Sequence, residues 1–515
     1  MGGQSRPAAN NKVTRDDLNA LVDRAADLIR TAVDYKFILT LLFMKRLNDQ
    51  WKVEKEQYKQ RLIKEAKLTE KEAEAEAEKT DVYHSFKIPR DFLWDEATKD
   101  VADLPQRLAT AIGETAKLNK ELQGVINRID FLEFARNQEN RELLRQLVEL
   151  FNKYDLAGEG VSPDILGDAY EHIIMKFAPL KAKEGEIYTP REVIKLLVEI
   201  LDPQPTQSVY DPCCGSGGML IGSHTHVEKK FGIAQTRKLF LFGQERNPEI
   251  YAVCQMNLIL HDIKSAEIAN ADSLDYPKFR DGDSLRKFDI VIGNPPWNQD
   301  GYGEERLKKA DFRERFSLGY PKRSNADWAW IQHMLASGGD KGRVGIVIDT
   351  GALFRGGVEK IIRGKIIEKD WVECVLLTPE KLFYNTIASG AIIVFNKEKP
   401  TSRKDKIVFI NATNEYVRHP SVKRLNSLST DNISKVAQAC KNFSELKGFS
   451  TIAKLTEVKA NDYNLSISLY VMPNEKQEFI DIGKEFKELK NLESQKKAIT
   501  ERLDTYISEI TKVLD

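Results

Sequence analysis

The sequence has no excess of charge of either sign. Its 515 residues include 78 Lys and Arg and 78 Asp and Glu, so the formal net charge is zero. A protein that holds DNA by itself is usually basic, because the release of counterions from neutralised phosphates dominates such affinity. Neutrality therefore indicates either a protein that does not bind nucleic acid or one that shares its DNA contacts with a partner.

Cysteine is scarce, and no two cysteines have the C-x-x-C spacing of a zinc or disulfide framework. The five cysteines are Cys213, Cys214, Cys254, Cys374 and Cys440. Such usage is typical of a protein in the reducing cytoplasm and argues against a structural zinc site. We therefore predict a cytoplasmic protein with no metal centre.

Long apolar runs are also missing. The N-terminal residues lack the apolar segment of a signal peptide, and the longest early apolar run, Phe37–Met44, is much too short to cross a bilayer. The sequence therefore predicts a soluble protein that is not exported and has no membrane partner.

The length predicts several domains, because a domain commonly holds about 100 to 200 residues. The polar residues 1–12 are predicted to be a disordered tail. Residues 13–158 repeat apolar side chains at the spacing of one helix face. The stretch Tyr35–Trp51 is more apolar than an exposed helix would be, so we expect it at the buried centre of an all-helical N-terminal domain.

From about residue 159 the pattern changes to short β-branched or aromatic runs that alternate with helical stretches. This alternation is typical of a parallel sheet with crossover helices. Residues 159–474 are therefore predicted to form a doubly wound, Rossmann-like α/β domain. The candidate strands are Ser208–Tyr210, Leu239–Phe242, Phe288–Ile292, Val344–Ile348, Trp371–Leu376 and Ala391–Phe395.

Residues 475–515 carry a long apolar stripe among Lys and Glu, which predicts a long C-terminal amphipathic helix. A stripe of this length needs something to cover it. The pattern alone leaves two covers open, which are the N-terminal helices of the same chain and a helix of a partner.

Three signals mark a ligand site, and the first is the segment SVYDPCCGSGGML. A predicted strand leads into Asp211 and then into a turn with Gly215, Gly217 and Gly218. Glycine permits a sharp turn and the close approach of a ligand to the backbone. Since the pattern is not G-x-G-x-x-G and no P-loop sequence occurs, NAD and ATP are disfavoured.

The second signal is Glu245, which stands just past the next predicted strand. A carboxylate there can accept hydrogen bonds from both hydroxyls of a ribose. Without the glycine turn before it, Glu245 would be read as an ordinary surface residue. Together the two features predict a crevice for an adenosine-bearing ligand at the carboxyl edge of the sheet.

The third signal is Asn294-Pro295-Pro296-Trp297, directly after an apolar strand. Two prolines cannot continue a sheet, and they lock the backbone in an extended shape. The Asn294 side-chain oxygen and the Pro295 carbonyl can then face one exocyclic amino group as two preset acceptors, while Trp297 offers a flat face for stacking. Downstream of a cofactor crevice, these four residues predict a catalytic loop rather than an ordinary turn.

The segment Asp211–Gly218 followed by Asn294–Trp297 resembles the cofactor and catalytic motifs of S-adenosylmethionine-dependent amino DNA methyltransferases. More closely, the chain resembles the modification (M) subunit of type I restriction-modification systems, an N6-adenine DNA methyltransferase. The resemblance extends over nearly the whole chain, and its further carriers are residues 25–47, 165–178, 185–197, 351–357 and 377–395.

The resemblance implies a role for each site residue. The catalytic residues, acting on an adenine flipped out of the duplex, would be Asn294, Pro295, Pro296 and Trp297. The segment closing over S-adenosylmethionine would be Glu186, Ile187, Tyr188, Thr189, Pro190 and Arg191. The glycine turn would hold the methionine portion through Asp211, Gly215, Ser216, Gly217 and Gly218. Glu245 would bind the ribose, and Asp272 would bind the adenine amino group.

Two features depart from the family's pattern. Cys213 and Cys214 stand where small residues are more usual, and we interpret them as small buried fillers. Trp297 stands where tyrosine or phenylalanine is commoner, and its ring can stack equally well.

The chain shows no domain for reading a DNA sequence. The insert Asn298–Ser324 mixes basic and acidic residues and is predicted to be a flexible loop near the DNA. The resemblance implies that a separate specificity (S) subunit reads double-stranded DNA, that two M subunits join it in an M2S1 complex, and that restriction (R) subunits cleave. It also assigns the helix of residues 475–515 to contacts with the S subunit.

Other functions remain open at this point. A solitary or type II amino DNA methyltransferase, acting on adenine N6 or cytosine N4, would use the same chemistry. N-P-P-[YFW] also serves protein glutamine and RNA guanine methyltransferases, although those chains are usually shorter and lack the helical N-terminal region. An inactive interaction subunit would keep the fold without turnover.

Overall fold

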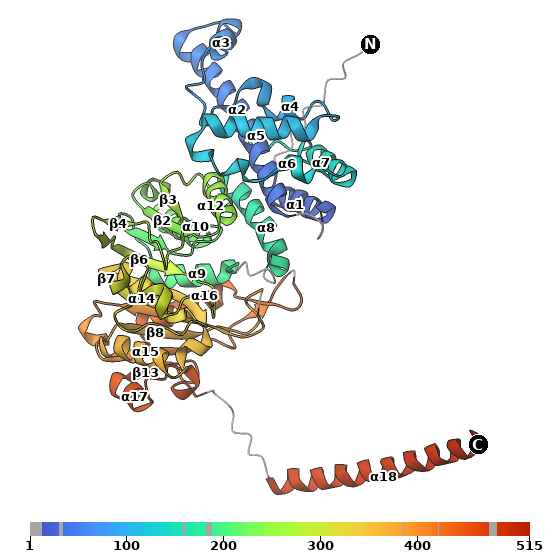
Figure 1. Ribbon diagram of the computed structural model, residues 1–515, viewed down its shortest axis with the longest axis vertical. Helices are drawn as coiled ribbons and strands as arrows, with labels where there is room; N and C mark the ends of the chain where they lie inside the picture. Colours follow the sequence, from blue (N-terminus) through green and yellow to red (C-terminus); the bar gives the residue numbers. More distant parts are fainter. Residues whose placement is uncertain are drawn as a thin grey trace. The chain divides into compact units, whose positions relative to one another are not determined.

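The computed structural model describes residues 13–29, 34–157, 161–181, 188–384, 386–420, 422–472 and 482–514. The predicted tail, residues 1–12, and two predicted cofactor residues, Glu186 and Ile187, lie outside the described residues. The chain divides into two compact units, Met1–Val471 and Met472–Asp515 (Figure 1). Each unit is described by itself.

The first unit begins with helices, as predicted. The stretch Ile38–Leu42 at the start of α2 is buried, which confirms that this apolar segment lies in a helical core. The helices of this region are α1 (Arg15–Ile29), α2 (Lys36–Ala66), α3 (Glu70–Ala77), α4 (Trp94–Ala97), α5 (Leu104–Leu118), α6 (Phe131–Phe134), α7 (Gln138–Phe151) and α8 (Pro163–Lys181). Within the described ranges, no helix is both long and apolar enough to cross a membrane.

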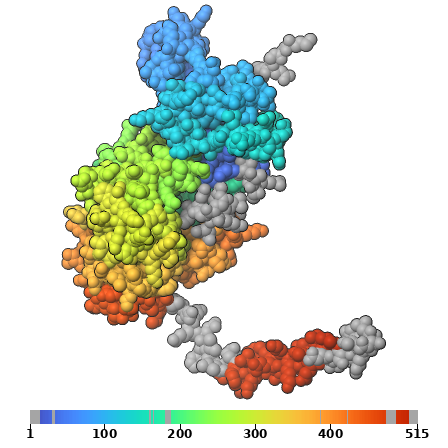
Figure 2. Space-filling model, in the orientation of Figure 1, coloured from blue at the N-terminus to red at the C-terminus, as the bar shows by residue number. Residues whose placement is uncertain are grey.

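Helix α8 joins the helical region to the sheet region. It packs against α1 on one side and against α12 (Pro248–Leu260) on the other (Figure 1). One hydrophobic core includes buried residues of α2, α7, α8 and α12. The Lys36 ammonium also lies 2.6 Å from the Glu249 carboxylate of α12. The two regions therefore lie directly against each other, blue to cyan against green in Figure 2.

The described sheet has nine strands in the order β13-β10-β8-β9-β7-β6-β1-β2-β3. The six predicted strands correspond to β1 (Ser208–Asp211), β2 (Phe240–Glu245), β6 (Phe288–Gly293), β7 (Gly338–Asp349), β8 (Val372–Leu377) and β9 (Gly390–Asn396). The prediction missed β3 (Ala266–Asn270), β10 (Lys406–Asn411) and β13 (Ser450–Lys454). Two small hairpins lie outside the sheet, β4 (Arg280–Asp281) with β5 (Ser284–Leu285) and β11 (Val417–Arg418) with β12 (Asn426–Ser427).

The sheet is mixed rather than purely parallel. Strands β7, β6, β1, β2 and β3 run parallel to one another, whereas β9 runs antiparallel to both β7 and β8. The described residues of the link from β8 to β9 (378–384 and 386–389) contain no helix, so no helical crossover returns the chain for a parallel strand. Strand β13 is likewise antiparallel to β10.

Helices cover both faces of the sheet, which confirms the doubly wound arrangement. Along β9, Ile392 and Val394 enter one core, and Ala391, Ile393 and Phe395 enter the other, since successive side chains point to opposite faces. The first core contains α9 (Arg191–Leu201), α10 (Gly218–Phe231) and α16 (Thr430–Asn442). The second contains α14 (Asp327–Ser337), α15 (Val358–Glu368) and α17 (Leu455–Ala460). Short helices α11 (Ile233–Thr236) and α13 (Glu304–Leu307) lie in connections.

The second unit consists of the long helix α18 (Ile482–Leu514), as predicted. Six of its described apolar side chains are each between 53% and 66% exposed, and they are Phe486, Leu489, Leu492, Ile499, Leu503 and Ile507. Residues 475–481 of the predicted helix lie outside the described residues.

The contact between α8 and α12 leads to a prediction about stability. A Cβ placed on Gly167 of α8 would lie 2.2 Å from the Cε1 atom of His261, so Gly167→Ala must displace this ring. We expect a loss of about 1 to 3 kcal/mol of unfolding free energy. Gly113 of α5 is the matched control, because its added Cβ meets nothing within 4 Å. Gly113→Ala should stabilise the protein by about 0.5 to 1 kcal/mol.

Thermal unfolding of both variants beside the wild type tests this prediction. Equal shifts of the two melting temperatures in the same direction would contradict a tight contact between the helical and sheet regions.

Candidate functional site

A cavity of about 320 Å³ opens at the carboxyl edge of the parallel strands. The residues that line it come from four strand ends and from the helical region. They are Tyr35, Ile174, Ala178, Tyr188, Pro212, Cys213, Gly215, Ser216, Glu245, Arg246, Asn247, Ile250, Val253, Ala271, Asp272, Ser273, Asn294, Pro296, Gln299, Tyr302 and Trp330.

The glycine turn after β1 forms one wall of this cavity. Gly215 and Gly217 have φ angles of 54° and 87°, a left-handed conformation that other residues seldom adopt. A Cβ built on Gly215 meets no atom within 4 Å, so the backbone faces open space. Gly217 is the N-cap residue of α10, which begins at Gly218. The turn therefore presents bare backbone beside a helix N-terminus, a setting that favours an anionic group.

Asp211 lies behind the turn and is 2% exposed. Its Oδ1 atom accepts a hydrogen bond of 3.0 Å from the backbone N–H of Cys213. Burial, together with the charge of nearby Glu245, raises the pKa of the Asp211 carboxyl to about 7. A buried carboxyl of this kind favours either a proton or a cationic ligand.

Glu245 ends β2 and ties this strand to the glycine turn. Its Oε2 atom accepts a hydrogen bond of 3.0 Å from the N–H of Gly215, and its Oε1 atom accepts one of 2.7 Å from the N–H of Asn247. Burial raises the pKa of its carboxyl. Each carboxylate oxygen has a second lone pair, so both can still accept from a ligand.

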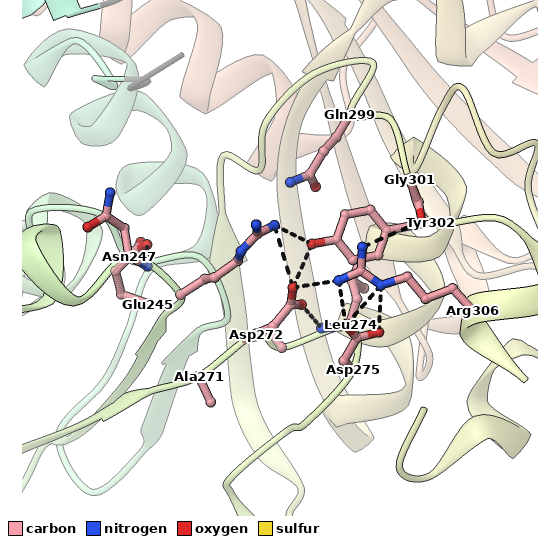
Figure 3. Close-up of polar contacts among 12 residues, drawn as sticks. Glu245, Asn247, Ala271, Asp272, Leu274, Asp275, Gln299, Gly301, Tyr302 and Arg306 are labelled. Carbon is pink, nitrogen blue, oxygen red and sulfur yellow. Dashed lines mark hydrogen bonds and ion pairs between the residues drawn. The ribbon is translucent and has the colours of Figure 1, made fainter. Parts of the chain in front are cut away.

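Asp272 is the centre of a polar network that the sequence did not predict (Figure 3). Its Oδ2 atom accepts hydrogen bonds from the Tyr302 hydroxyl at 2.6 Å and from an Nη atom of Arg306 at 3.3 Å. Arg246 donates to the Tyr302 oxygen at 2.8 Å, and the Arg306 guanidinium lies over the Tyr302 ring. Burial, with the hydrogen bond to Asp272, raises the pKa of Tyr302 to about 12.

This network changes the interpretation of the insert Asn298–Ser324, which was expected to be a flexible loop. Tyr302, Leu307 and Phe316 of the insert are buried. Arg315 donates to the backbone oxygens of Ser273 and Leu274. The insert is therefore anchored to the end of β3. The charged sequence of the insert did not predict this anchoring, because the partners of its charged residues lie far away in the sequence.

The loop Asn294–Trp297 follows β6 as predicted, and the Asn294 side chain is held at both ends. Its Nδ2 atom donates to the Thr189 hydroxyl at 2.9 Å, and its Oδ1 atom accepts from Trp297 Nε1 at 2.9 Å. An indole N–H can only donate, so this contact requires the amide oxygen on the Trp297 side. One lone pair of that oxygen stays available.

Trp297 does not line the cavity. Its ring makes an edge contact with Phe383, with centroids 4.7 Å apart, and lies against Gly390 at the start of β9. A Cβ at Gly390 would lie 2.9 Å from the Trp297 ring. The loop between β8 and β9 thus forms the support for this indole.

The segment Tyr188–Arg191 has several separate contacts. Tyr188 lines the cavity, and Thr189 is bonded to Asn294. Pro190 is the N-cap residue of α9. Arg191 instead binds α8, with its Nε 2.6 Å from Glu171 and an Nη 3.1 Å from Asp168.

The structure brings about half of the predicted site residues to the cavity wall. Those that line it are Tyr188, Gly215, Ser216, Glu245, Asp272, Asn294 and Pro296. Those described elsewhere are Thr189, Pro190, Arg191, Asp211, Gly217, Gly218, Pro295 and Trp297. Lining residues such as Tyr35 and Ile174 come from the helical region, and no local pattern in the sequence marks them.

Of the two cysteines predicted to be buried fillers, only Cys214 is buried; Cys213 is partly exposed and lines the cavity. Cys214 is buried, with its sulfur 4.0 Å from that of Cys254 in α12. Contact with the Cys254 thiol and burial raise the pKa of Cys214, which disfavours a reactive thiolate. Among the described residues, no group of three or more His, Cys, Asp or Glu side chains could hold a metal ion.

Two family models match the chain in succession. Residues 18–151 match the HsdM N-terminal domain, and residues 161–479 match N-6 DNA Methylase. The first covers the helices before α8, and the second covers the sheet and the cavity.

Similar proteins extend over nearly the whole chain. The type I restriction enzyme MjaVII methylase subunit of Methanocaldococcus jannaschii is 40% identical over 97% of this chain and 85% of its own length. The MjaVIII methylase subunit of the same organism is 40% identical over 98% of this chain and 86% of its own length. A crystal structure of the type I restriction-modification methyltransferase subunit from Streptococcus thermophilus is 27% identical. It matches with a TM-score of 0.74 over 89% of this chain and 100% of that chain.

The raised pKa of Asp211 leads to a pH-dependent prediction. A carboxyl whose pKa is about 7 in the folded protein, against 3.8 ordinarily, stabilises the unliganded fold fully below about pH 4. This stability is lost as the pH rises through about 7. Asp211→Asn removes the titration and keeps the acceptor for Cys213. We therefore expect the variant to gain stability over the wild type with rising pH, by about 4 kcal/mol at most.

Thermal unfolding of the unliganded wild type and variant between pH 4 and 8 measures the difference. If the stabilities of the wild type and the variant change in parallel over this range, the pKa of Asp211 is not raised by burial.

Proposed function

Because the chain belongs to the N-6 DNA methylase family and, within it, to the methylase subunits of type I restriction enzymes, we propose that its cavity binds S-adenosylmethionine and that adenine N6 is its methyl acceptor. The chain is the catalytic M subunit of a type I restriction-modification enzyme. One observation carries the proposed chemistry. Asn294, the glycine turn and Glu245 line the same cavity.

The described residues fit S-adenosylmethionine. This molecule has a carboxylate, two cationic centres and an adenosine. The open backbone at Gly215 and the N-terminus of α10 suit the carboxylate, and the buried Asp211 suits the cationic end. Glu245 retains lone pairs for both ribose hydroxyls.

We assign Asp272 to bind the amino group of the adenine in S-adenosylmethionine. This carboxylate already accepts from Leu274, Tyr302 and Arg306, and its oxygens have one further lone pair to offer. Tyr302 also lines this end of the cavity. Residues 186–191 would close the site, and Tyr188 is the member of this segment that reaches the cavity wall.

The sulfonium of S-adenosylmethionine supplies an activated methyl group, so the chain's own residues need mainly to orient the acceptor. The N6 amino group of the target adenine in DNA is a poor nucleophile, because its lone pair is delocalised into the ring. Asn294 Oδ1 and the Pro295 carbonyl would accept its two N–H bonds and favour a more tetrahedral nitrogen. Positive charge grows on this nitrogen during transfer, so both acceptors then bind more strongly.

The contacts of Asn294 support this role. Thr189 and Trp297 fix the direction of its carboxamide, while one lone pair of Oδ1 stays open for the base. Prolines 295 and 296 hold the second acceptor in an extended backbone. A base inside a duplex cannot reach such a cavity, so the target must be flipped out. Because Trp297 does not line the cavity, its proposed stacking on the base would take place beside the cavity and would offset part of that cost.

The proposed partners are double-stranded DNA, an S subunit that reads the sequence, a second M subunit in an M2S1 complex, and R subunits. The relatives are methylase subunits of type I restriction enzymes, which supports assembly with other subunits. Helix α18 has at least six apolar side chains that are more than half exposed. We assign this stripe to the S subunit, since an apolar face of that length is stable when another helix covers it.

Two substitutions should separate chemistry from cofactor binding. Asn294→Ala should lower methyl transfer by at least about 100-fold, because it removes a positioned acceptor. Its dissociation constant for S-adenosylmethionine should stay close to that of the wild type. Glu245→Ala should instead weaken cofactor binding by about 10-fold or more, since it removes charge-assisted hydrogen bonds.

Calorimetry with S-adenosylmethionine and tritium transfer to DNA, both with the S subunit present, measure the two effects. Nucleoside analysis of the product must give N6-methyladenine; N4-methylcytosine would overturn the proposed acceptor. Wild-type transfer by Asn294→Ala, or unchanged affinity in Glu245→Ala, would remove the corresponding assignment.

Removal of the terminal helix tests the proposed subunit contact. A chain that ends at residue 474 should lose most of its co-purification with the S subunit, because the apolar stripe of α18 is absent. Its binding of S-adenosylmethionine should match that of the full chain, which controls for folding. Full recovery of the S subunit with the shortened chain would contradict the assignment.

A further inference from the structure

The residue that leaves the N-P-P-W loop is held at three points. Asn298 has a φ of 52°, so its backbone is in the left-handed region. Its N–H donates to Asp327 Oδ1 at 3.0 Å. Its side-chain oxygen accepts from Asn325 Nδ2 at 2.7 Å and from Arg355 Nη1 at 3.0 Å. The exit of the loop is therefore fixed by side chains that come from distant parts of the sequence.

Arg355 is the hub of these contacts. Its Nη2 binds Asp327 at the start of α14, its Nη1 lies 3.1 Å from Asp349 at the end of β7, and its Nε lies 2.9 Å from Glu359 in α15. A single guanidinium thus joins three carboxylates and Asn298. Lysine could not replace it, because an ammonium lacks the planar fork that binds several acceptors in fixed directions.

The carboxylates depend on this arginine. Asp327 is 1% exposed, and burial raises the pKa of its carboxyl. A buried carboxylate is costly unless it is paired and hydrogen-bonded. Without Arg355, the Asp327 carboxylate would face those of Asp349 and Glu359 with no guanidinium between them. Repulsion would then displace Asp327, which accepts the hydrogen bond from the Asn298 N–H.

The sequence around Arg355 is shaped for this cluster. Arg355 belongs to the segment GALFRGG, which the proposed chemistry leaves without a role. A Cβ on Gly351 would lie 2.1 Å from Arg355 Nη1 and 2.6 Å from Asp349 Oδ1. The first glycine of the segment therefore leaves the space that the guanidinium occupies.

We infer that Arg355 is a positioning residue for methyl transfer, which acts through Asn298 to hold the N-P-P-W loop. It would keep Trp297 and Asn294 in the orientation that faces the target base. This inference rests on the proposed role of Asn294. A displacement of a catalytic group by about 1 Å can lower a rate on the order of 100-fold.

A matched control separates positioning from a purely structural role. Arg343 lies on β7, the strand that ends at Asp349, and its side chain is 26% exposed, against 27% for Arg355. Like Arg355 it pairs with a buried carboxylate, Glu373. However, the other partners of Arg343 are the backbone oxygens of Ile200 and Leu201 rather than any atom of Asn298.

The experiment compares Arg355→Lys, Arg355→Ala and Arg343→Ala in the complex with the S subunit. Single-turnover methyl transfer to unmodified genomic DNA gives the rate, calorimetry gives the affinity for S-adenosylmethionine, and thermal unfolding gives the stability. Asn298→Gly is a milder variant, because glycine keeps the left-handed backbone while the amide is lost. It serves if the Arg355 variants fail to fold.

We expect both Arg355 variants to lose about 100-fold in transfer rate, with cofactor affinity changed by less than about threefold. Asn298→Gly should also lower the transfer rate while leaving cofactor affinity nearly unchanged, but its rate should fall less. Arg343→Ala should lower the melting temperature with less than about a tenth of that effect on rate. Equal rate losses in Arg343→Ala and Arg355→Ala, or a wild-type rate in Arg355→Lys, would overturn the inference. Asn294→Ala in the same assay reports on the catalytic role itself, so a failure of that proposal is recognised separately.

Discussion

The parallel pairing of β1 between β2 and β6 is the constraint on which the site depends. Because parallel strands end at the same edge, the pairing brings Asp211, Glu245 and Asn294 together from distant positions in the chain. Helices bury both faces of this sheet, so the polar groups of the site have only the edge to occupy. The glycine turn then joins two of the strand ends, since Gly215 donates to Glu245. The residues proposed for the cofactor and for the methyl acceptor thus share one cavity as a direct consequence of strand order.

The parts of this site that could be predicted are those that local sequence dictates. A glycine turn, an acidic residue past an apolar strand and a double proline each follow from the chemistry of a few adjacent residues. The missed strands β3 and β13 are short. Strand β9 was expected to run parallel, because the sequence of the link before it looks like an ordinary loop between parallel strands and does not reveal a hairpin. Tyr302 and Arg306 were missed for a different reason. Their function in the fold depends on Asp272 and Asp275, and only the folded chain brings these four residues together.

The insert shows how basic charge close to the cavity is balanced within the chain. Lys308 and Lys309 lie 2.6 Å and 3.5 Å from Glu304 and Glu305, and Arg306 is paired with Asp275. Much of the basic charge near the cavity is therefore compensated within the chain. The cavity itself requires carboxylates, because the proposed cofactor is cationic. Such a subunit has little uncompensated positive charge for binding DNA phosphates, which is consistent with DNA contacts that are shared with a partner.

The two ends of the N-P-P-W loop are restrained by different elements, and this explains how neutral acceptors can suffice. Thr189, just before α9, holds the amide of Asn294 at the entrance, and Arg355, just before α15, holds Asn298 at the exit. The prolines between them remove most of the remaining backbone freedom. Amide and carbonyl oxygens stabilise a growing positive charge only modestly in water, where they would first have to reorient. In the proposed mechanism they are held in place before the base arrives, so they would need no such reorganisation and their full dipoles would act on the transition state.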